Sequence, residues 1–371
     1  MPRKLKIAAI QMDATPAPTA KRLACAEMLI KQAVDAGADL VVLPELFNIG
    51  YRYHANNYRH AEPFNGQTVT WMRQQAALHR IHLAGTLLLR DADEVYNTAL
   101  LFSPDGRNWR YDKNYPWAWE RAYFRESESI TIADTDLGNL GMMICWDYAH
   151  PELWQRYAGR VDAIIIMSCP PTMHQLRLVF PNKTLIIGDR YYTGNETPFG
   201  TDLDLLAAWM RVPVINTTGS GTFRTAVPRP LISMIAASLL HPRLLGYLWQ
   251  AKQATIEGAY YQQTKIINPH GYVIARGVAD SNQVVVGDVE LADEQPTPIG
   301  PHPKFPYTRL AYFISDTFLP WLMLPVYRRG YRRIIGAQMA PIDRTTRFWQ
   351  WVVVGAFGLG WLLGRFGKYK R

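Results

Sequence analysis

Cysteine is scarce in this chain, which has three cysteines among 371 residues. So few thiols in so long a chain exclude a disulfide framework and are typical of a reducing compartment, where a free thiol persists. The first residues, from Met1 to Lys6, lack the apolar stretch of a secretory signal. We therefore expect the main body of the protein to be cytoplasmic.

Acidic residues are nearly absent from the last part of the chain. The stretch from Pro296 to Arg371 has 12 lysines and arginines and two acidic residues, whereas the first 295 residues are near neutral, with a net charge of −1. Such asymmetry indicates a separate role for the tail, at an anionic membrane surface or on nucleic acid. The residues around the tail arginines are apolar, which favours the membrane, so we expect no nucleic-acid partner.

Several cofactor signatures are also missing. The sequence has no glycine-rich phosphate loop and no internal repeat, and its nine histidines show no spacing typical of a metal site. We interpret Asp202 and Asp204 as a helix cap rather than a pair of metal ligands. We therefore expect neither a metal nor an organic cofactor.

Over about the first 290 residues, strand-like and helix-like segments follow one another. Strands are expected at 6–11, 39–43, 81–89, 97–102, 109–113, 139–145, 162–167, 212–216, 262–268, 272–275 and 283–289, and helices at 19–36, 71–79 and 151–157. Thr19 is the expected N-cap of the first helix. Apolar strands mixed with helices indicate an α/β layer architecture.

Two segments depart from this alternation of strands and helices, and the domain boundaries are predicted from them. Val227–Lys252 is an insertion with two apolar runs, split by a proline and too short to span a bilayer. Residues 296–371 begin with a proline-rich linker and continue with the aromatic-rich segment Leu310–Tyr327 and a basic cluster at Arg328–Arg333. We predict one domain at 1–295, and a membrane-associating tail at 296–371.

The end of the tail is an apolar segment, Phe348–Phe366. Its uncharged part, Trp349–Gly364, would span roughly 24 Å as a helix, which is short of the roughly 30 Å hydrocarbon core. Arg347 and Arg365 could extend that reach by snorkelling. A spanning or re-entrant anchor, an in-plane amphipathic helix and a buried oligomer helix all remain open.

Three local patterns place reactive side chains at the ends of expected strands. Glu45 follows the apolar run 39–43, Lys113 ends the second strand of an expected hairpin, and Cys145 ends the apolar run 140–144. A thiol becomes a strong nucleophile as the thiolate, and it therefore needs a base or a cation nearby. Together the three residues would supply a nucleophile, a base and a cation.

With these patterns the chain resembles the nitrilase superfamily of carbon–nitrogen hydrolases, over about residues 4 to 290. The resemblance also includes the segments 7–12, 36–45, 96–99, 104–106 and 268–273. It implies an α-β-β-α sandwich, a Glu, Lys, Cys triad in this chain order and a paired or higher oligomer. The Cys145 thiol would be the nucleophile, Glu45 the base and Lys113 the oxyanion stabiliser, assisted by the backbone N–H of Trp146.

The resemblance also implies a second glutamate after the lysine, and Glu120 lies seven residues beyond Lys113. We assign Glu120 to positioning Lys113 and the substrate or attacking water. The other two cysteines, Cys25 and Cys169, are interpreted as structural.

The residues after Cys145 give mixed indications of the substrate class. Asp147 and Pro151-Glu152 after the nucleophile resemble the amidase branches, whereas Trp146 is more typical of nitrile hydrolysers. Amide hydrolysis is favoured, and nitrile hydrolysis, N-acyl transfer and a catalytically idle scaffold of a membrane complex remain open. We expect the 227–252 insertion to guide an amphiphilic or long-chain amide from the membrane to Cys145, unless it is an oligomer contact. The expected location is the cytoplasmic face of a membrane.

Overall fold

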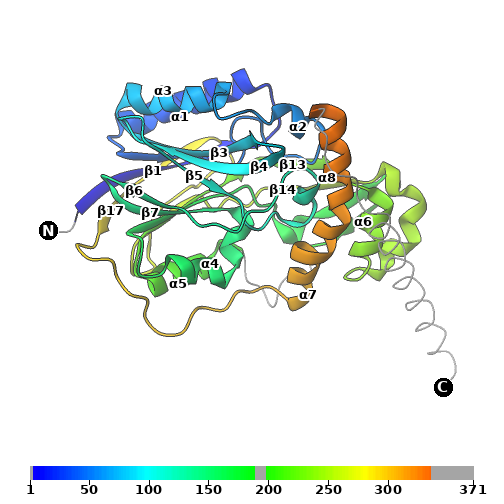
Figure 1. Ribbon diagram of the computed structural model, residues 1–371. Helices are drawn as coiled ribbons and strands as arrows, with labels where there is room; N and C mark the ends of the chain where they lie inside the picture. Colours follow the sequence, from blue (N-terminus) through cyan, green and yellow to red (C-terminus); the bar gives the residue numbers. More distant parts are fainter. Residues whose placement is uncertain (1–2, 189–197, 336–371) are drawn as a thin grey trace.

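Two mixed β-sheets lie face to face in the centre of the molecule, and helices cover their outer faces (Figure 1). The computed structural model describes residues 3–188 and 198–335. This arrangement confirms the predicted α-β-β-α sandwich. The apolar segment Phe348–Phe366, with its predicted Trp349–Gly364 helix, lies outside the described residues.

The first sheet has the strand order β12-β1-β2-β3-β4-β5, and β17 pairs with β1 in antiparallel orientation. Its strands are β1 (Arg3–Asp13), β2 (Leu40–Val42), β3 (His82–Asp91), β4 (Glu94–Phe102), β5 (Asn108–Asp112), β12 (Gly219–Ser220) and β17 (Gln283–Leu291). Helices α1 (Thr19–Asp35) and α3 (Gln67–His79) cover its outer face (Figure 1). Apolar side chains of α1 recur every three or four positions and are buried, as this packing requires.

The second sheet has the order β16-β15-β11-β8-β7-β6. Its strands are β6 (Ile132–Thr135), β7 (Gly138–Ile144), β8 (Ala163–Met167), β11 (Val214–Thr217), β15 (Lys265–Ile267) and β16 (Val273–Arg276). Helices α4 (Pro151–Tyr157) and α5 (Thr201–Met210) lie on its outer face (Figure 1). The parallel strands β7 and β8 are buried on both faces, which explains their unbroken apolar sequence.

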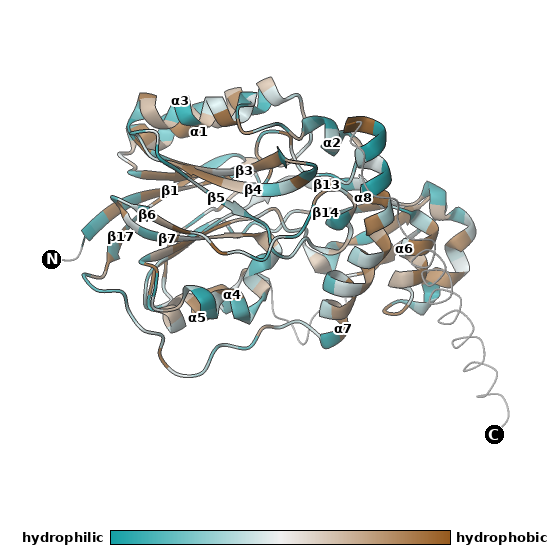
Figure 2. Ribbon diagram, in the orientation of Figure 1, coloured by the Kyte–Doolittle hydropathy of each residue, from teal (hydrophilic) through white to brown (hydrophobic). Residues whose placement is uncertain are grey.

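A smaller four-stranded sheet was not predicted from the sequence. Its strands are β9 (Arg177–Phe180), β10 (Lys183–Ile186), β13 (Thr222–Ala226) and β14 (Thr255–Ala259). The predicted insertion Val227–Lys252 connects β13 to β14 through α6 (Pro230–Ala237) and the 3₁₀ segment η4 (Pro242–Gln253). It projects at one end of the molecule, and its helices contain many apolar residues (Figure 2).

The C-terminal helices, residues 309–335, pack against the hydrolase body. They comprise α7 (Arg309–Tyr312), the π-helical turn η5 (Phe313–Phe318) and α8 (Leu319–Ile335). Leu322, Met323 and Tyr327 are buried, and α8 contacts α2 (Asn56–His60) and the 3₁₀ turn η1 (Ala118–Ala122). Among the described residues, no helix combines the length and apolar character needed to cross a membrane.

Two predicted helix caps are wrong. Helix α1 includes Thr19 as its first residue, and Pro18 takes the N-cap position without a side-chain hydrogen bond. Helix α5 is preceded by Gly200 as its N-cap, and Asp202 lies in the first turn. The Asp202 carboxylate accepts a hydrogen bond from the Tyr148 hydroxyl (2.9 Å), a tertiary contact that local sequence does not reveal.

Candidate active site

Cys145, the predicted nucleophile, lies on a sharp turn between β7 and the 3₁₀ segment η2 (Cys145–Ala149). Cys145 has φ 49°, in the left-handed region that side-chain-bearing residues rarely adopt. Such a conformation costs of order 1–3 kcal/mol and persists where its surroundings hold it. Cys145 is 7% exposed and is a free thiol. The strain at this position is typical of a functional turn rather than of a core cysteine.

Asp147 ties this turn to the segment that carries the lysine. Its carboxylate accepts hydrogen bonds from the Ile144 N–H (3.1 Å), the Tyr111 hydroxyl (2.7 Å) and the N–H groups of Asn114 (3.1 Å) and Tyr115 (2.8 Å). All these groups are at or beside the ends of β5 and β7. Asp147 therefore fixes the nucleophile turn relative to Lys113, although sequence reasoning used it only as a marker of substrate class.

Glu45 lies just beyond the end of β2, in a second strained turn. The next residue, Leu46, has φ 49°, and its N–H donates to the Thr86 hydroxyl at 2.7 Å. The buried Arg22 donates from Nε to the carbonyl of Phe47 at 2.8 Å. Contacts from β3 and α1 thus aim the Glu45 side chain into the space between the sheets.

Lys113 connects the two glutamates in a fully buried cluster. Its Nζ donates to Glu45 Oε1 at 2.9 Å and to Glu120 Oε2 at 2.8 Å. The side chains of Lys113 and Glu45 are 0% exposed and that of Glu120 is 1% exposed. Asn97 Nδ2 donates to the same Glu45 oxygen at 2.8 Å. The other Glu45 oxygen, Oε2, has no hydrogen-bond partner among the described residues, so it is available for a proton.

Glu120 is held on η1 by contacts that orient it toward Lys113. Its Oε2 accepts from the Trp117 N–H at 2.7 Å, and the Tyr51 hydroxyl donates to its other oxygen. Ala118, which lies between Trp117 and Glu120 in the sequence, has φ 49° and is a third strained position beside the cluster. The sequence suggested Glu120 but had no signal for Tyr51, which comes from a loop about seventy positions earlier.

Burial dominates the electrostatics of the site. It raises the pKa of Glu45 from 4.5 to about 7, outweighing the opposing effect of Lys113. Burial also raises the pKa of the Cys145 thiol well above its usual value, and the Glu45 carboxylate adds to this. For Lys113 burial would lower the pKa, but Glu120 and Glu45 together raise it well above its usual value. The resting site therefore pairs a neutral thiol with a permanent cation and a base that titrates near neutrality.

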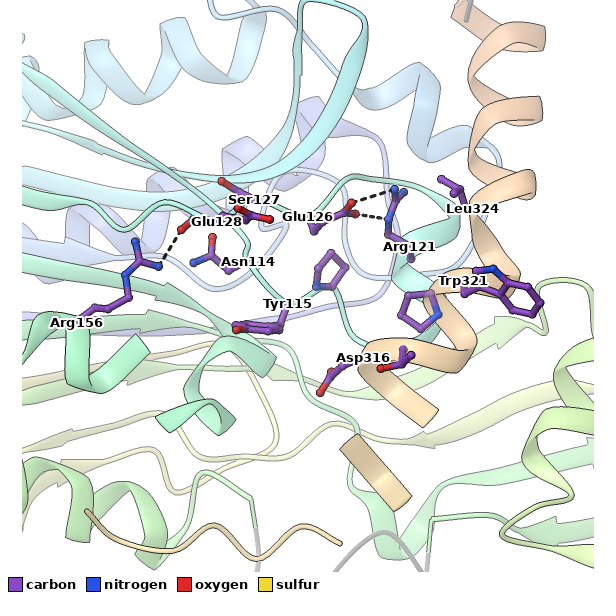
Figure 3. A pocket seen from close by; sticks show the side chains of 13 residues that line it. Asn114, Tyr115, Arg121, Glu126, Ser127, Glu128, Arg156, Asp316, Trp321 and Leu324 are labelled. Carbon is purple, nitrogen blue, oxygen red and sulfur yellow. Dashed lines mark hydrogen bonds and ion pairs between the residues drawn. The ribbon is translucent and has the colours of Figure 1, made fainter. Parts of the chain in front are cut away.

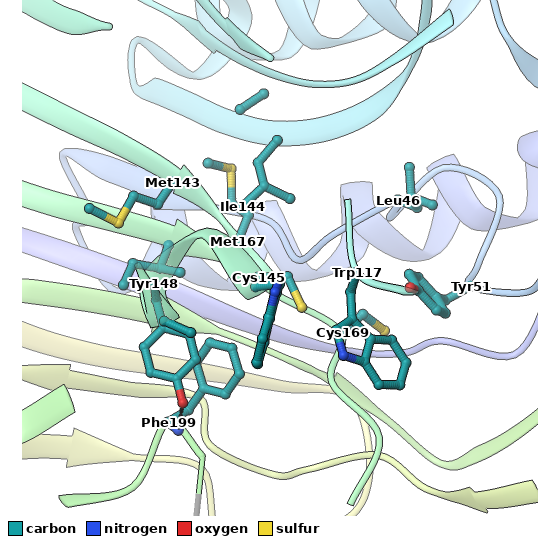
Figure 4. Close-up of a cluster of buried hydrophobic side chains, with 14 of the residues drawn as sticks. Leu46, Tyr51, Trp117, Met143, Ile144, Cys145, Tyr148, Met167, Cys169 and Phe199 are labelled. Carbon is teal, nitrogen blue, oxygen red and sulfur yellow. Dashed lines mark hydrogen bonds between the residues drawn. The ribbon is translucent and has the colours of Figure 1, made fainter. Parts of the chain in front are cut away.

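Cys145 lies in an apolar cluster with Ile144, Met167 and Trp117 (Figure 4). The backbone amide of Cys169 also lies against its thiol and lowers the pKa in partial opposition to burial. Cys169, interpreted as structural, therefore contributes its main chain to the site. Its own thiol is buried, with a pKa raised by that burial.

Trp146 follows the nucleophile, and its indole Nε1 donates to Asp316 Oδ1 at 2.6 Å. Asp316 belongs to η5 in the C-terminal helices, so the tail reaches the nucleophile turn. The predicted role of the Trp146 backbone N–H as an oxyanion donor stays a prediction. In the described part of the chain, no cluster of His, Cys, Asp or Glu is placed to hold a metal ion.

Comparison with known proteins agrees with this geometry. Residues 6–188 match the family model described as carbon-nitrogen hydrolase. A nitrilase of Pyrococcus abyssi is 31% identical over 152 residues, which cover 40% of this chain and 58% of the relative, little more than half its length. An omega-amidase NIT2 of Danio rerio is 26% identical over 236 residues, covering 58% of this chain and 82% of the relative.

Solved structures share the fold. XC1258 from Xanthomonas campestris, a CN-hydrolase superfamily protein, is 16% identical with a TM-score of 0.56, covering 92% of this chain and 100% of that one. Nit3 of Saccharomyces cerevisiae, a member of branch 10 of the nitrilase superfamily, is 20% identical with a TM-score of 0.55, covering 78% and 90%. The family match over residues 6–188 and the shared fold thus support the predicted membership of the nitrilase superfamily of carbon–nitrogen hydrolases.

Proposed function

We propose that this protein hydrolyses a non-peptide amide through an acyl-enzyme on Cys145. The observation that carries this proposal is the buried Lys113 that bridges Glu45 and Glu120 beside a strained cysteine turn. Relatives named as omega-amidases, and a structural neighbour named as an amidase, favour an amide over a nitrile. Nitrile hydrolysis remains the second candidate, because one relative is named a nitrilase.

In the first half-reaction, Glu45 takes the thiol proton while the Cys145 sulfur attacks the amide carbonyl carbon. The carbonyl electrons move onto oxygen, and the Lys113 ammonium and the Trp146 N–H stabilise that oxyanion. Glu45 then gives its proton to the nitrogen, the C–N bond breaks and ammonia or an amine leaves. A thioester between the acyl group and Cys145 remains.

In the second half-reaction, Glu45 takes a proton from water, which attacks the thioester carbon. The C–S bond breaks, the acid leaves and the proton returns to the Cys145 sulfur. Glu120 holds Lys113 in place throughout and lies where it can orient the water. The pKa of Glu45, raised by burial to about 7, suits a group that both accepts and donates a proton near neutral pH.

We further propose that the amide is amphiphilic. An apolar cavity of about 40 Å³ begins at the segment Trp117–Trp119, next to Glu120, and is also lined by Ala237 and Leu240 of the insertion and Leu319 of α8. A volume of this size holds roughly three water molecules, or a short apolar group. A longer chain would continue between the insertion and the C-terminal helices.

The proposed location is the cytoplasmic face of a membrane. Trp249 and Leu231 of the insertion are 77% and 46% exposed, a pattern suited to the headgroup zone. Much of the apolar face of 310–327 packs on the body, so lipid contact there would fall to exposed residues such as Phe313. The basic cluster Arg328–Arg333 would face anionic headgroups. A homodimer or higher oligomer also remains a prediction.

The central experiment measures ammonia release from amides and nitriles of increasing chain length. We expect amides with longer acyl chains to be hydrolysed faster, and Cys145→Ala to abolish turnover. Ala237→Phe should fill the apolar cavity and lower kcat/KM for long-chain amides while leaving a short-chain amide unaffected. Equal rates for short and long chains would contradict the amphiphilic substrate.

Three further outcomes separate the alternative functions. Faster ammonia release from nitriles would favour nitrile hydrolysis, and hydroxamate formation with added hydroxylamine would reveal acyl transfer. No labelling of Cys145 by a thiol-reactive amide mimic would favour the idle scaffold. Flotation with vesicles containing anionic lipid tests the membrane proposal: the full chain should float, and Trp249→Ala should weaken this.

A further inference from the structure

The C-terminal helices contact the nucleophile turn through one carboxylate. Asp316 of η5 accepts the Trp146 indole N–H on Oδ1 at 2.6 Å and lies 3.2 Å from His150 Nε2 through Oδ2. Trp146 and His150 are 5% and 4% exposed, and the Asp316 side chain is 19% exposed. One carboxylate thus bridges the two ends of the turn that begins at Cys145.

The bridge closes a ring of contacts around Trp146. The other ring nitrogen of His150, Nδ1, lies 3.0 Å from the Trp146 carbonyl oxygen, so the imidazole is held between Trp146 and Asp316. The ring of Tyr115 stacks on that imidazole, with centroids 3.5 Å apart and planes within 5°. The indole, the carboxylate, the imidazole and the Trp146 carbonyl therefore constrain Trp146, the residue that follows Cys145.

Asp316 also lines a cavity that Figure 3 shows from close by. Asp316 and Tyr115 stand on one side of this cavity of about 580 Å³, into which the pair Arg121 and Glu126 also faces. A second contact from the same helices reinforces the attachment, because the Tyr312 hydroxyl donates to the Ala149 carbonyl at 2.7 Å. The segment is thus joined by hydrogen bonds to both halves of η2.

We infer that Asp316 is a positioning residue for the nucleophile turn and that the C-terminal helices complete the active site. The turn is strained at Cys145, so its peptide units need external support to keep one conformation. Asp316 supplies that support by holding the Trp146 side chain and, through His150, the Trp146 carbonyl, and the proposed reaction uses the backbone N–H of the same residue on the oxyanion. The inference rests on the proposed function. Asp316 lies outside the matched segment 6–188, so the family resemblance does not assign it.

The test compares two readouts that depend differently on the Trp146 peptide. Amide turnover needs a well-placed oxyanion donor, whereas alkylation of the Cys145 thiol by iodoacetamide forms a bond at a methylene carbon and creates no oxyanion. A misplacement of about 1 Å can lower a rate about 100-fold. We expect Asp316→Ala to lower kcat by about 10- to 100-fold, with KM and the alkylation rate changing by less than about threefold.

Matched variants separate positioning from folding. Asp316→Asn keeps an oxygen that accepts the indole N–H, so it should restore kcat to within about threefold of the wild type. Thr317→Ala, on the exposed neighbouring residue, should leave both readouts unchanged. An Asp316→Ala variant with wild-type kcat would overturn the inference. So would a parallel loss of kcat and alkylation, because that pattern means a collapsed site.

A double-mutant cycle tests whether Asp316 acts through its hydrogen bond to the Trp146 indole. Trp146→Phe keeps an aromatic ring but removes the indole N–H, so it should lower kcat about as much as Asp316→Ala. The double variant should lose little more than either single variant, because both remove the same contact. If the fold-loss of kcat in the double variant equals the product of the two single losses, the inference is overturned. A wild type that hydrolyses no amide or nitrile would defeat the proposed function and this inference with it, whereas an active wild type with an unaffected Asp316→Ala defeats the inference alone.

Discussion

Glu45→Gln separates the catalytic role of this carboxylate from the stability cost of burying it. Burial raises the pKa of Glu45 from 4.5 to about 7. Each pKa unit corresponds to about 1.4 kcal/mol, so this difference of 2.5 units corresponds to about 3 kcal/mol. The folded protein binds this proton more tightly than the unfolded chain does. The stabilisation is therefore fully present below pH 4.5 and is lost as pH rises through about 7.

Glutamine does not titrate, so the variant escapes this loss. Between about pH 4.5 and pH 8, the free energy of unfolding of Glu45→Gln should improve relative to the wild type by about 3 kcal/mol. In contrast to its stability, the activity of Glu45→Gln should fall. The variant lacks the base, so its kcat should be about 10²- to 10⁴-fold lower than that of the wild type. In the wild type, the acylation rate should rise with pH and level off above about 7.

Urea denaturation followed by tryptophan fluorescence at several pH values measures the stability difference, and single-turnover kinetics measure acylation. Cys145→Ser is the matched control, because it removes the thiol but keeps Glu45 and should retain the wild-type pH dependence of stability. A stability difference between Glu45→Gln and the wild type that does not change with pH would refute the reasoning. So would near wild-type acylation by the variant.

Three further predictions follow from buried contacts. Lys113→Met should lower kcat/KM by about 10²- to 10³-fold through the lost oxyanion donor, measured by ammonia release. It should also lower the free energy of unfolding by about 3–5 kcal/mol, because two buried carboxylates lose their counter-ion. Asp147→Ala leaves four donors unpaired and should lower the free energy of unfolding by about 3 kcal/mol or more in urea titrations. Tyr327→Phe removes a hydroxyl that bonds the Val95 N–H and Glu94, and should cost about 1–2 kcal/mol without changing kcat.

Each of these has a matched control. Lys113→Arg keeps the charge but cannot fit the compact ammonium position, so near wild-type activity in it would contradict the assigned geometry. Asp147→Asn keeps part of the acceptor set and should fall between Asp147→Ala and the wild type. Tyr331→Phe, on the next turn of α8, should have a smaller effect than Tyr327→Phe. The reverse order would contradict the contacts of Tyr327.

Local sequence was informative wherever one element alone decided the structure. The buried runs that became β7 and β8 could be read as strands because both faces are covered and no polar residue interrupts them. The position of Cys145 followed from the β7 run, that of Glu45 from the apolar run that became β2, and that of Lys113 from the hairpin of β4 and β5. The strands β9, β10, β13 and β14 were missed, because half-exposed strands of mixed composition have no comparable signal.

The candidate nucleophile, base and cation could thus be predicted from the amino-acid sequence, since Glu45 and Cys145 follow buried apolar runs and Lys113 ends the second strand of a recognisable hairpin. Only the tertiary structure showed that Tyr51 joins the cluster through Glu120, and that Asp316 holds Trp146 from 170 positions away. Such contacts depend on how separate elements pack, and packing of that kind leaves no local periodicity to detect. The position of the Cys145 thiol at the end of β7 could therefore be predicted from the sequence. The contacts that hold its turn in place could be found only in the folded structure.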